Sequence, residues 1–475
     1  MDSSVAIQPH IAVCPSAGIG HLTPFLRLAS MLSPPPSTTN NSCNITLTLT
    51  LIIIRPTLSS AEENQINTFL STHPHINSSH FQILPVDNNN SSNSKKQDPF
   101  VVHYDAVFRS SYLLANHLST LSPQPSVVFS DLMLASGITK PLADLGIPNY
   151  TLISTSASFF TLMVTSASLR TTSGDSDSDS DGDEIPGLGP IPMDDIPPFL
   201  MSEPDNNMLT RIIDTNCRHL HETKGVLLNS FDFFEPESVS TLQSGKLLAT
   251  LPPIFPIGPF ISVGSLKGSN NISWLDNQPP KSVVFISFGS RTAMAKDQIR
   301  ELGKGIERSG ISFLWVIKTT VVDKEDKEEL NDLLGEAFFM NTKERGLIVK
   351  EWVNQEVILA HSAIGGFLSH CGWNSVMEAA QRGVPLLAWP LHGDQRVNAR
   401  VVEKAGLGVW ERSWGWIGER LVKSEEIALK IQEMMTSEKL KKSAARVGEE
   451  ATKAWEIDGS SKKMFGKIID NICQK

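Results

Sequence analysis

The sequence predicts an α/β protein with two domains, each built around a parallel β-sheet. The chain has 475 residues, and a single hydrophobic core stops growing at about 250–300 residues. In both halves, short apolar runs alternate with longer amphipathic runs, which is the pattern of βαβ units. No internal repeat with a period of about 20–50 residues is present, so the halves share an architecture and not a repeated unit.

The first half supplies the strands of an N-terminal domain, which we place at residues 1–250. These strands are short runs of apolar and β-branched residues. They are expected at residues 10–14, 45–54, 81–86, 127–130 and 149–153. Helices are expected at residues 22–32 and 132–145. Gly146 ends the second helix, because glycine commonly follows the last turn.

The second half repeats the alternation and gives a C-terminal domain at residues 276–455. Strands are expected at residues 282–288, 313–318, 347–350, 364–369 and 386–389. Helices are expected at residues 296–308, 355–361, 374–382, 395–404, 424–435 and 439–455. The intervening stretch is rich in proline and glycine, so we place an interdomain linker at residues 251–275.

Three polar segments have neither helical nor strand periodicity. They are residues 34–42, 88–96 and 173–184. The third segment alternates aspartate with serine and holds six acidic residues. It cannot bury apolar surface, and we expect it to be disordered.

The balance of charge argues against two classes of partner. With 41 basic and 51 acidic residues the net charge is −10, whereas nucleic acid and anionic membranes attract basic surfaces. The most apolar run, residues 45–54, is half the length of about 20 residues that spans a bilayer. The first residues also lack the pattern of a signal peptide. We expect a soluble cytoplasmic protein without a membrane span, a monomer that binds small molecules.

The cysteines and aspartates do not form the patterns of metal sites. The five cysteines are scattered and include no C-x-x-C pair, so neither a disulfide framework nor a structural zinc site is expected. No Asp-x-Asp pair follows a predicted strand, since the alternating aspartates lie in residues 173–184. We therefore expect no metal ion.

The turn after the first strand holds the first candidate residue. Ligands of open α/β sheets bind beyond the carboxyl ends of the strands, and His21 opens a helix at such an end. Gly18-x-Gly20 suggests a dinucleotide fingerprint, but Thr23 occupies the place of its third glycine. An NAD-dependent oxidoreductase is one alternative. A histidine that only caps or packs against its helix is another.

Asp131 follows the strand at residues 127–130, again at a carboxyl end. If the two strands are neighbours, Asp131 can accept the Nδ1–H of His21. That bond would fix the tautomer in which Nε2 acts as a general base. Asp131 also fits the N-cap of the helix that follows it, and both roles could coexist.

A second candidate site follows the strand at residues 364–369. His370-Cys371-Gly372 turns directly into a helix, whose N–H groups and positive dipole end suit a diphosphate. Gly372 lets the backbone approach closely, and the Gly289-Ser290 turn can close on the same phosphates. Side-chain donors are expected from His370, Asn374 and Ser375.

Further residues around this helix suit the remaining parts of a nucleotide sugar. Glu378 lies four residues after Asn374 on the same helix face and can bind ribose hydroxyls. Trp352 offers an aromatic face to a base, and Gln355 can bond nearby. Donors and acceptors for sugar hydroxyls come from Asp394 and Gln395. Taken singly, a tryptophan in this segment could equally be a core residue.

Residues 352–395 read WVNQEVILAHSAIGGFLSHCGWNSVMEAAQRGVPLLAWPLHGDQ. This segment resembles the signature of plant secondary-product glycosyltransferases, the family 1 UDP-sugar transferases. Its core, H-C-G-W-N-S-x-x-E, rarely occurs by chance. The GIGHLTP start at residues 18–24 and the SFGS turn at residues 287–290 also fit. One departure is Val353-Asn354, where the family commonly has Ala-Pro.

The resemblance implies a GT-B fold, with two Rossmann-like domains whose parallel sheets face a central cleft. The N-terminal domain would bind the acceptor and the C-terminal domain UDP-glucose, a co-substrate, with no other cofactor. Residues 456–475 would form a helix that packs back on the N-terminal domain. The implied UDP contacts are Gly289, Ser290, Trp352, Val353, Gln355, His370, Gly372, Asn374, Ser375 and Glu378. The implied sugar contacts are Trp373, Asp394 and Gln395, and a terminal Gln tends to accompany glucose.

The acceptor side resembles the branch that contains flavonoid C-glucosyltransferases. The resemblance is carried by Asp98-Pro99-Phe100, by residues 290–294 and 185–188, and by Ile196-Pro197-Pro198. It implies acceptor contacts from Gly20, Phe100, Tyr104 and Phe199. Spacing alone would make Phe100, Tyr104 and Phe108 one apolar helix face, which is more often core than pocket.

The expected reaction is an inverting transfer of glucose to a flavonoid-type polyphenol, with His21 as the base and Asp131 as its partner. On resemblance, the product would be a C-glucoside of a 2-hydroxyflavanone or dihydrochalcone. Flavonoid O-glucosylation is the alternative. A non-catalytic nucleotide-sugar-binding protein is a further one, although such a protein would not need a base.

Overall fold

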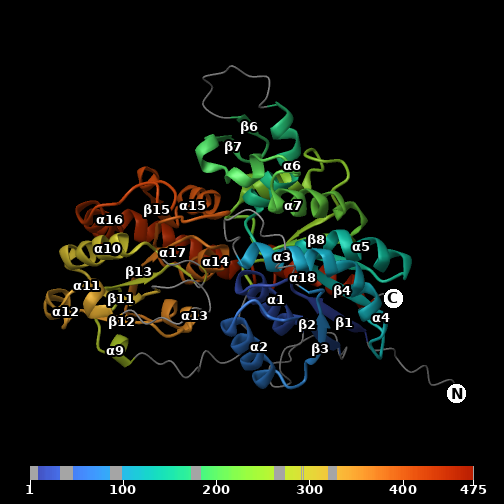
Figure 1. Ribbon diagram of the computed structural model, residues 1–475, viewed down its shortest axis with the longest axis horizontal. Helices are drawn as coiled ribbons and strands as arrows, with labels where there is room; N and C mark the ends of the chain where they lie inside the picture. The colour runs from blue at the N-terminus through green and yellow to red at the C-terminus, as the bar shows by residue number, and fades with distance from the viewer. Residues whose placement is uncertain are drawn as a thin grey trace. The chain divides into compact units, whose positions relative to one another are not determined.

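The computed structural model describes residues 9–32, 47–85, 99–172, 183–260, 273–289, 291, 294–318 and 329–473. Its internal contacts divide the chain into two units. Unit 1 consists of Met1–Asp232, Pro236–Gly264 and Ile457–Lys475. Unit 2 consists of Phe233–Glu235 and Ser265–Glu456. Figure 1 labels the helices and strands of both units.

Unit 1 is built on a seven-stranded sheet in the order β3-β2-β1-β4-β5-β8-β9, in which all neighbours are parallel. Its strands are β1 (His10–Cys14), β2 (Thr48–Arg55), β3 (Asn77–Gln82), β4 (Val127–Asp131), β5 (Asn149–Ile153), β8 (Gly225–Leu228) and β9 (Ile254–Pro256). The order changes direction between β1 and β4, and such a switch point opens a crevice at the carboxyl ends of the strands.

The helices of unit 1 connect these strands as parallel crossovers require. They are α1 (Ile19–Leu32), α2 (Ser60–Thr72), α3 (Pro99–Ser110), α4 (Leu114–Ser119), α5 (Ala135–Asp144), α6 (Ala157–Thr172), α7 (Met208–Arg218), α8 (Pro236–Gln243) and α18 (Ser460–Cys473). The last helix contacts β9 within this unit. A small antiparallel pair, β6 (Asp183–Ile185) and β7 (Gly189–Ile191), lies after α6.

Unit 2 is built on a six-stranded parallel sheet in the order β12-β11-β10-β13-β14-β15. Its strands are β10 (Val283–Ser287), β11 (Ser312–Val316), β12 (Gly346–Val349), β13 (Ile364–Ser369), β14 (Leu386–Ala388) and β15 (Gly408–Trp410). Counted from its first strand the order is 3-2-1-4-5-6, the Rossmann order, with the switch point between β10 and β13.

The helices of unit 2 follow the same alternation. They are α9 (Ser273–Asp276), α10 (Lys296–Ser309), α11 (Leu330–Leu334), α12 (Glu336–Thr342), α13 (Gln355–Leu359), α14 (Trp373–Arg382), α15 (Gln395–Lys404), α16 (Ser424–Thr436) and α17 (Glu438–Lys453). Helix α10 packs along α16, and α14 packs along α17.

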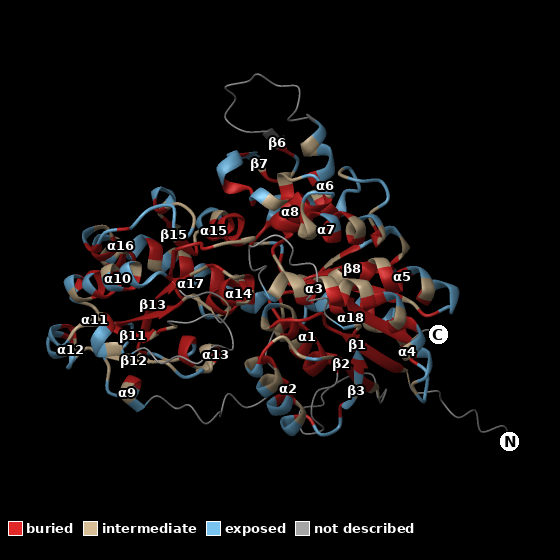
Figure 2. Ribbon diagram, in the orientation of Figure 1, coloured by how far each residue is buried: buried red, intermediate tan, exposed pale blue. Residues whose placement is uncertain are grey.

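The core of each unit lies on the faces of its sheet. Every residue of the central strands β1, β4, β5, β10 and β13 is buried. These strands have little polar pattern because helices cover both faces of a parallel sheet. Figure 2 shows buried strands in both units, and exposed residues gathered on the outer faces of the helices.

Three sequence predictions need correction. The strand expected at residues 81–86 lies earlier, as β3. Strand β9 lies inside the predicted linker at residues 251–275, where proline and glycine hide a three-residue strand. Asp183 and Glu184, the end of the predicted acidic disordered segment, belong to β6. Residues 34–42, 88–96 and 173–182 lie outside the described residues.

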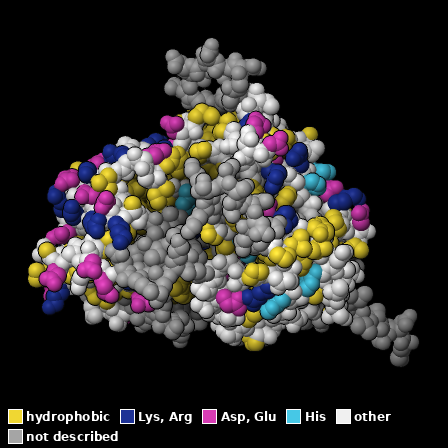
Figure 3. Space-filling view, viewed as in Figure 1, with side chains coloured by type: hydrophobic (Ala, Val, Ile, Leu, Met, Phe, Trp, Pro, Cys, Tyr) yellow, Lys and Arg dark blue, Asp and Glu magenta, His cyan; other side chains and the backbone are white. Residues whose placement is uncertain are grey.

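The surface has mixed charge on the face that Figure 3 shows. Basic and acidic side chains are interspersed there and are not gathered by sign. Such a face creates no large field of one sign. Among the described residues, no helix combines the length and the apolar character that crossing a membrane requires.

Candidate functional site

His21 and Asp131 lie together at the carboxyl end of the sheet in unit 1. Nδ1 of His21, the third residue of α1, lies 2.8 Å from Oδ2 of Asp131, the last residue of β4. Strands β1 and β4 are direct neighbours, so the two side chains meet at the switch point. The side chain of His21 is 21% exposed and that of Asp131 is 1% exposed. The hydrogen bond predicted from the sequence is thus present.

Asp131 uses both of its carboxylate oxygens. Oδ1 accepts a hydrogen bond of 2.8 Å from the backbone N–H of Met133, which caps the short 3₁₀ turn Leu132–Leu134. The two interpretations of Asp131, histidine partner and N-cap, are therefore both correct. Because the cap fixes the carboxylate, Asp131 holds His21 at a defined angle.

Ser154 is a neighbour of His21 that the sequence did not identify. Its Oγ lies 2.9 Å from Nδ1 of His21. It follows β5, the strand next to β4, and so reaches the same end of the sheet. In the sequence, Ser154 is marked by its position directly after a predicted strand. Many serines share such a position, so it does not single out a functional residue.

Glu62 is a second neighbour that the sequence did not identify. This carboxylate on α2 is only 4% exposed. It accepts hydrogen bonds from the backbone N–H groups of Gly18 at 3.0 Å and Leu58 at 2.8 Å. Burial raises its pKa, while these backbone bonds and the charge of His21 act in the opposite direction. In the sequence, the pattern Ser59-x-x-Glu62 is that of a capping box and gives no sign of the link to the turn at Gly18.

The four predicted acceptor residues lie on three elements of unit 1. Gly20 is exposed on α1, and a Cβ added there would meet open space. Phe100 and Tyr104 pack on one another on α3, with ring centroids 4.3 Å apart. Tyr104 is buried, and its ring meets that of His21 edge to face at 5.5 Å. Phe199 is partly exposed, in a 3₁₀ turn before α7.

In unit 2, one imidazole ring fills the switch point between β10 and β13. A Cβ added to Gly289, just after β10, would lie 2.7 Å from Nε2 of His370. A Cβ added to Gly372 would lie 2.5 Å from the same atom. The two glycines therefore leave room for the ring, and Gly289 also adopts a left-handed φ of 78°. Ser290 lies outside the described residues.

His370 stays uncharged near neutral pH. Burial lowers its pKa to about 3; the charge of His392 acts in the same direction, and a backbone hydrogen bond with Ser287 acts in the opposite one. An uncharged imidazole can still donate one hydrogen bond to an anion. The positive dipole end of α14 can supply favourable charge at this site.

The turn before α14 places the N-terminus of this helix beside the ring of His370. Cys371 adopts a left-handed φ of 63°, uncommon for a residue with a side chain. Asn398 holds the turn by donating to the carbonyl oxygen of Cys371 at 3.0 Å. The intrahelical ladder begins with the bond from Val376 N to Gly372 O, so the N–H groups before it point out of the helix end.

Gln355, Ser375 and Glu378 form one cluster. Nε2 of Gln355 donates to Oγ of Ser375 at 2.9 Å and to Oε2 of Glu378 at 2.7 Å. The structure thus brings together three residues predicted to bind UDP from two helices, α13 and α14. Trp352 lies just before α13 with 63% of its surface exposed, although large aromatic residues usually hide more. Val353 is partly exposed.

The three predicted sugar residues differ in what their side chains contact. Trp373 is 3% exposed and packs near Phe234 at a ring distance of 6.0 Å. Oδ2 of Asp394 accepts a bond from Asn398 at 2.8 Å. Gln395 is buried, and its Oε1 accepts from the backbone N–H groups of Leu391 and His392 at 2.8 and 3.1 Å. Gln395 therefore holds the turn that precedes it.

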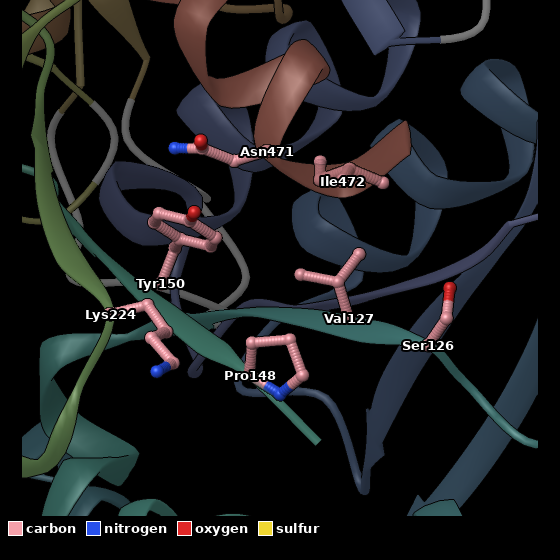
Figure 4. A pocket seen from close by; sticks show the side chains of 7 residues that line it. All are labelled: Ser126, Val127, Pro148, Tyr150, Lys224, Asn471 and Ile472. Carbon is pink, nitrogen blue, oxygen red and sulfur yellow. The ribbon is translucent and has the colours of Figure 1, made fainter. Parts of the chain in front are cut away.

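A separate pocket of about 290 Å³ lies at the opposite, amino end of the sheet in unit 1. It is lined by residues that precede or begin β4, β5 and β8, and by the end of α18, as Figure 4 shows. Its lining consists of Ser126, Val127, Pro148, Tyr150, Lys224, Asn471 and Ile472. None of the predicted site residues lines it.

Comparisons with known proteins show the family to which the chain belongs. Residues 270–448 match the family model described as "UDP-glucoronosyl and UDP-glucosyl transferase". The chain is 48% identical to UDP-glycosyltransferase 708C1 of Fagopyrum esculentum, over 98% of this chain and 96% of that protein. It is 40% identical to UDP-glycosyltransferase CGT of Oryza sativa subsp. japonica, with the same coverage.

Solved structures are similar over almost the whole chain. The crystal structure of LpCGTa in complex with UDP has a TM-score of 0.82 at 36% identity, covering 98% of this chain and 99% of that one. The crystal structure of Medicago truncatula UGT71G1 complexed with UDP-glucose has a TM-score of 0.80 at 27% identity, covering 99% and 100%. The predicted fold class, GT-B with two Rossmann-like parallel sheets, is confirmed.

Proposed function

The chain belongs to the plant UDP-glycosyltransferase family, and on that premise we propose that it transfers glucose from UDP-glucose to a flavonoid-type polyphenol. The observation that carries the proposal is the 2.8 Å hydrogen bond between His21 and Asp131. A histidine held this way at a sheet switch point is oriented to accept a proton through Nε2.

The donor assignment is supported by the chemistry of unit 2. A helix N-terminus beside the two glycines and His370 suits a diphosphate, which needs donors but no fixed positive charge. The exposed Trp352 suits stacking on uracil. Glu378, already bonded to Gln355, suits the ribose hydroxyls. The similar Medicago truncatula protein is itself complexed with UDP-glucose in its crystal structure.

The proposed reaction is a single displacement with inversion. Nε2 of His21 accepts the phenolic proton, and Asp131 stabilises the imidazolium that forms. The phenolate shares its charge with the ortho ring carbon. That carbon attacks the anomeric carbon, the bond from the anomeric carbon to the diphosphate oxygen breaks, and UDP leaves. The ring carbon then loses its hydrogen as a proton to solvent, and the imidazolium of His21 returns its proton to the phenolic oxygen, which restores the aromatic phenol and gives a β-C-glucoside.

We favour a C-glucoside of a 2-hydroxyflavanone or dihydrochalcone over an O-glucoside. The support is resemblance: the names of the rice relative and of LpCGTa both contain CGT, for C-glucosyltransferase. Mild acid separates the two outcomes, because it cleaves O-glucosides and leaves the carbon–carbon bond. An NMR correlation from the anomeric proton to a ring carbon without an oxygen would support the C-glucoside, and glucose released by mild acid would contradict it.

A protein that binds UDP-glucose without transferring it is the competing function. Incubation with UDP-glucose and a panel of phenols separates the two. The proposed function predicts UDP release that depends on the acceptor and a product of increased mass. UDP binding without acceptor-dependent UDP release would favour the binding protein.

A further inference from the structure

The turn that precedes His21 is fixed by two hydrogen bonds to a single peptide group, the one between Ala17 and Gly18. The hydroxyl of Tyr104 donates to the carbonyl oxygen of Ala17 at 2.6 Å. The N–H of Gly18 donates to Oε1 of Glu62 at 3.0 Å. The two side chains come from different helices, α3 and α2, so the peptide group is fixed from two directions.

This peptide group leads directly into the helix of His21. The carbonyl oxygen of Gly18 accepts hydrogen bonds from the N–H of His21 at 3.0 Å and of Leu22 at 2.9 Å, which start α1. Gly18 has a left-handed φ of 92°, a conformation that costs little only for glycine. A rotation of this peptide would therefore move the first turn of α1, and with it the imidazole of His21.

Glu62 and Tyr104, the two side chains that bond to this peptide, are both buried. Glu62 is 4% exposed and Tyr104 is 3% exposed, so water has little access to stand in for either. The second oxygen of Glu62 accepts from Leu58 N at 2.8 Å, which ties the carboxylate to the start of α2. The ring of Tyr104 also contacts the ring of His21.

We propose that Glu62 and Tyr104 are positioning residues, which act through the Ala17–Gly18 peptide to hold His21 in its catalytic orientation. This inference rests on the proposed function, in which His21 is the base. It gives Tyr104 a role different from the acceptor contact implied by resemblance. The two roles predict different kinetics, because an acceptor contact acts on binding and a positioning contact acts on turnover.

The first test is Tyr104→Phe, which removes the hydroxyl and keeps the ring. We expect kcat to fall about tenfold while KM for the acceptor and for UDP-glucose stay within about twofold, because small displacements of a catalytic group are costly. The matched control is Tyr150→Phe, a buried tyrosine of the same unit at the amino end of the sheet (Figure 4). The control should keep wild-type kcat. A raised acceptor KM with unchanged kcat in Tyr104→Phe would overturn the inference.

The second test compares two variants of Glu62. Glu62→Gln keeps one acceptor oxygen, whereas Glu62→Ala removes both, so kcat should fall more in the alanine variant and be partly rescued in the glutamine variant. Equal, wild-type kcat in both would overturn the inference.

A crystal structure of the double variant Glu62→Ala/Tyr104→Phe separates this inference from the proposed function. The inference predicts a rotated Ala17–Gly18 peptide and a longer distance between Nδ1 of His21 and Asp131. An unmoved turn would overturn it, whatever the activity. A wild-type protein that transfers no sugar would contradict the proposed function alone.

Discussion

At the scale of single residues, the phosphate-binding assignment depends on the two glycines that leave room for the imidazole of His370. Alanine at either position would bring a methyl group well inside van der Waals contact with Nε2 of that ring. Because the ring lies between these two backbone segments, either substitution would force the ring or the turn around it to shift at the start of α14.

Gly289→Ala is expected to weaken UDP binding about tenfold or more, measured by calorimetry. The expected cost combines overpacking of about 1–3 kcal/mol with strain at a left-handed φ. Gly310→Ala is the matched control, since Gly310 has a similar φ of 71° but open space around its Cβ position. Both variants should lose stability, and only Gly289→Ala should lose UDP affinity. Equal UDP affinity in the two would contradict the assignment.

His370 makes the folding stability of the protein depend on pH. Its pKa is about 3 in the folded protein and about 6.5 in an unfolded chain. Between these values the unfolded chain binds the extra proton, so folding stability falls as the pH falls from about 6.5 toward 3. We expect His370→Gln to lose less stability than wild type between pH 7 and pH 4 in urea unfolding. The same loss in both proteins would argue against a buried neutral His370.

The sequence identified residues whose chemistry is visible in their type and position. His21 and Asp131 each follow a strand, and neighbouring strands bring such residues together. Ser154 and Glu62 were not predicted, because a serine after a strand and a glutamate at the third position of a helix both have common structural explanations. Their contacts with His21 and Gly18 arise only from the tertiary arrangement.

At the scale of elements, Asn354 explains how this chain tolerates its departure from the Ala-Pro of the family. Asn354 is the N-cap of α13, and its side chain accepts a hydrogen bond of 3.3 Å from Val357 N. A proline suits the start of a helix through its fixed φ, and asparagine serves the same start by capping. The start of α13, the helix that carries Gln355, is therefore stabilised by a side-chain cap and not by a proline.

Asn354→Ala is expected to cost about 1 kcal/mol of stability and to weaken UDP binding, because α13 carries Gln355 toward Glu378. The matched control is Asn207→Ala, which removes the N-cap of α7 in unit 1. The control should lose a similar amount of stability and keep its UDP affinity. If both variants bind UDP like the wild type, the cap does not support the site.

Most strands of the two large sheets were predictable because buried parallel strands are apolar throughout. Helix α15 and strands β1, β5 and β13 have the bounds expected from the sequence. The edge strand β3 reads Asn-Ser-Ser-His-Phe-Gln and is mostly exposed, so it has no apolar run to reveal it. Strand β9 is hidden in a stretch of prolines.

At the scale of the whole molecule, the net charge of −10 is concentrated in one segment. Residues 173–184 hold six acidic and no basic residues, and without them 45 acidic residues face 41 basic ones, a balance of −4. The predicted UDP contacts all lie elsewhere in the sequence. The predicted contacts with the acceptor and with the sugar lie elsewhere as well, so we expect this segment to contribute charge to the protein and no residue to either candidate site.

Deleting residues 174–181 is expected to leave UDP affinity within about twofold of the wild type, since charges that lie more than about 8 Å apart in solvent are largely screened at physiological salt. Calorimetry with UDP, repeated at low and high salt, checks this. A large loss of affinity that persists at high salt would assign the segment a direct role in binding.

The most direct test of the account is acceptor-dependent UDP release from UDP-glucose by the wild type, His21→Ala and Asp131→Asn. The account predicts a glucosylated polyphenol from the wild type and a loss of about 10²–10⁴ in turnover for His21→Ala. Asp131→Asn should also lose turnover, because it favours the wrong tautomer of His21. Near-normal turnover in His21→Ala, or no acceptor-dependent UDP release from the wild type, would contradict it.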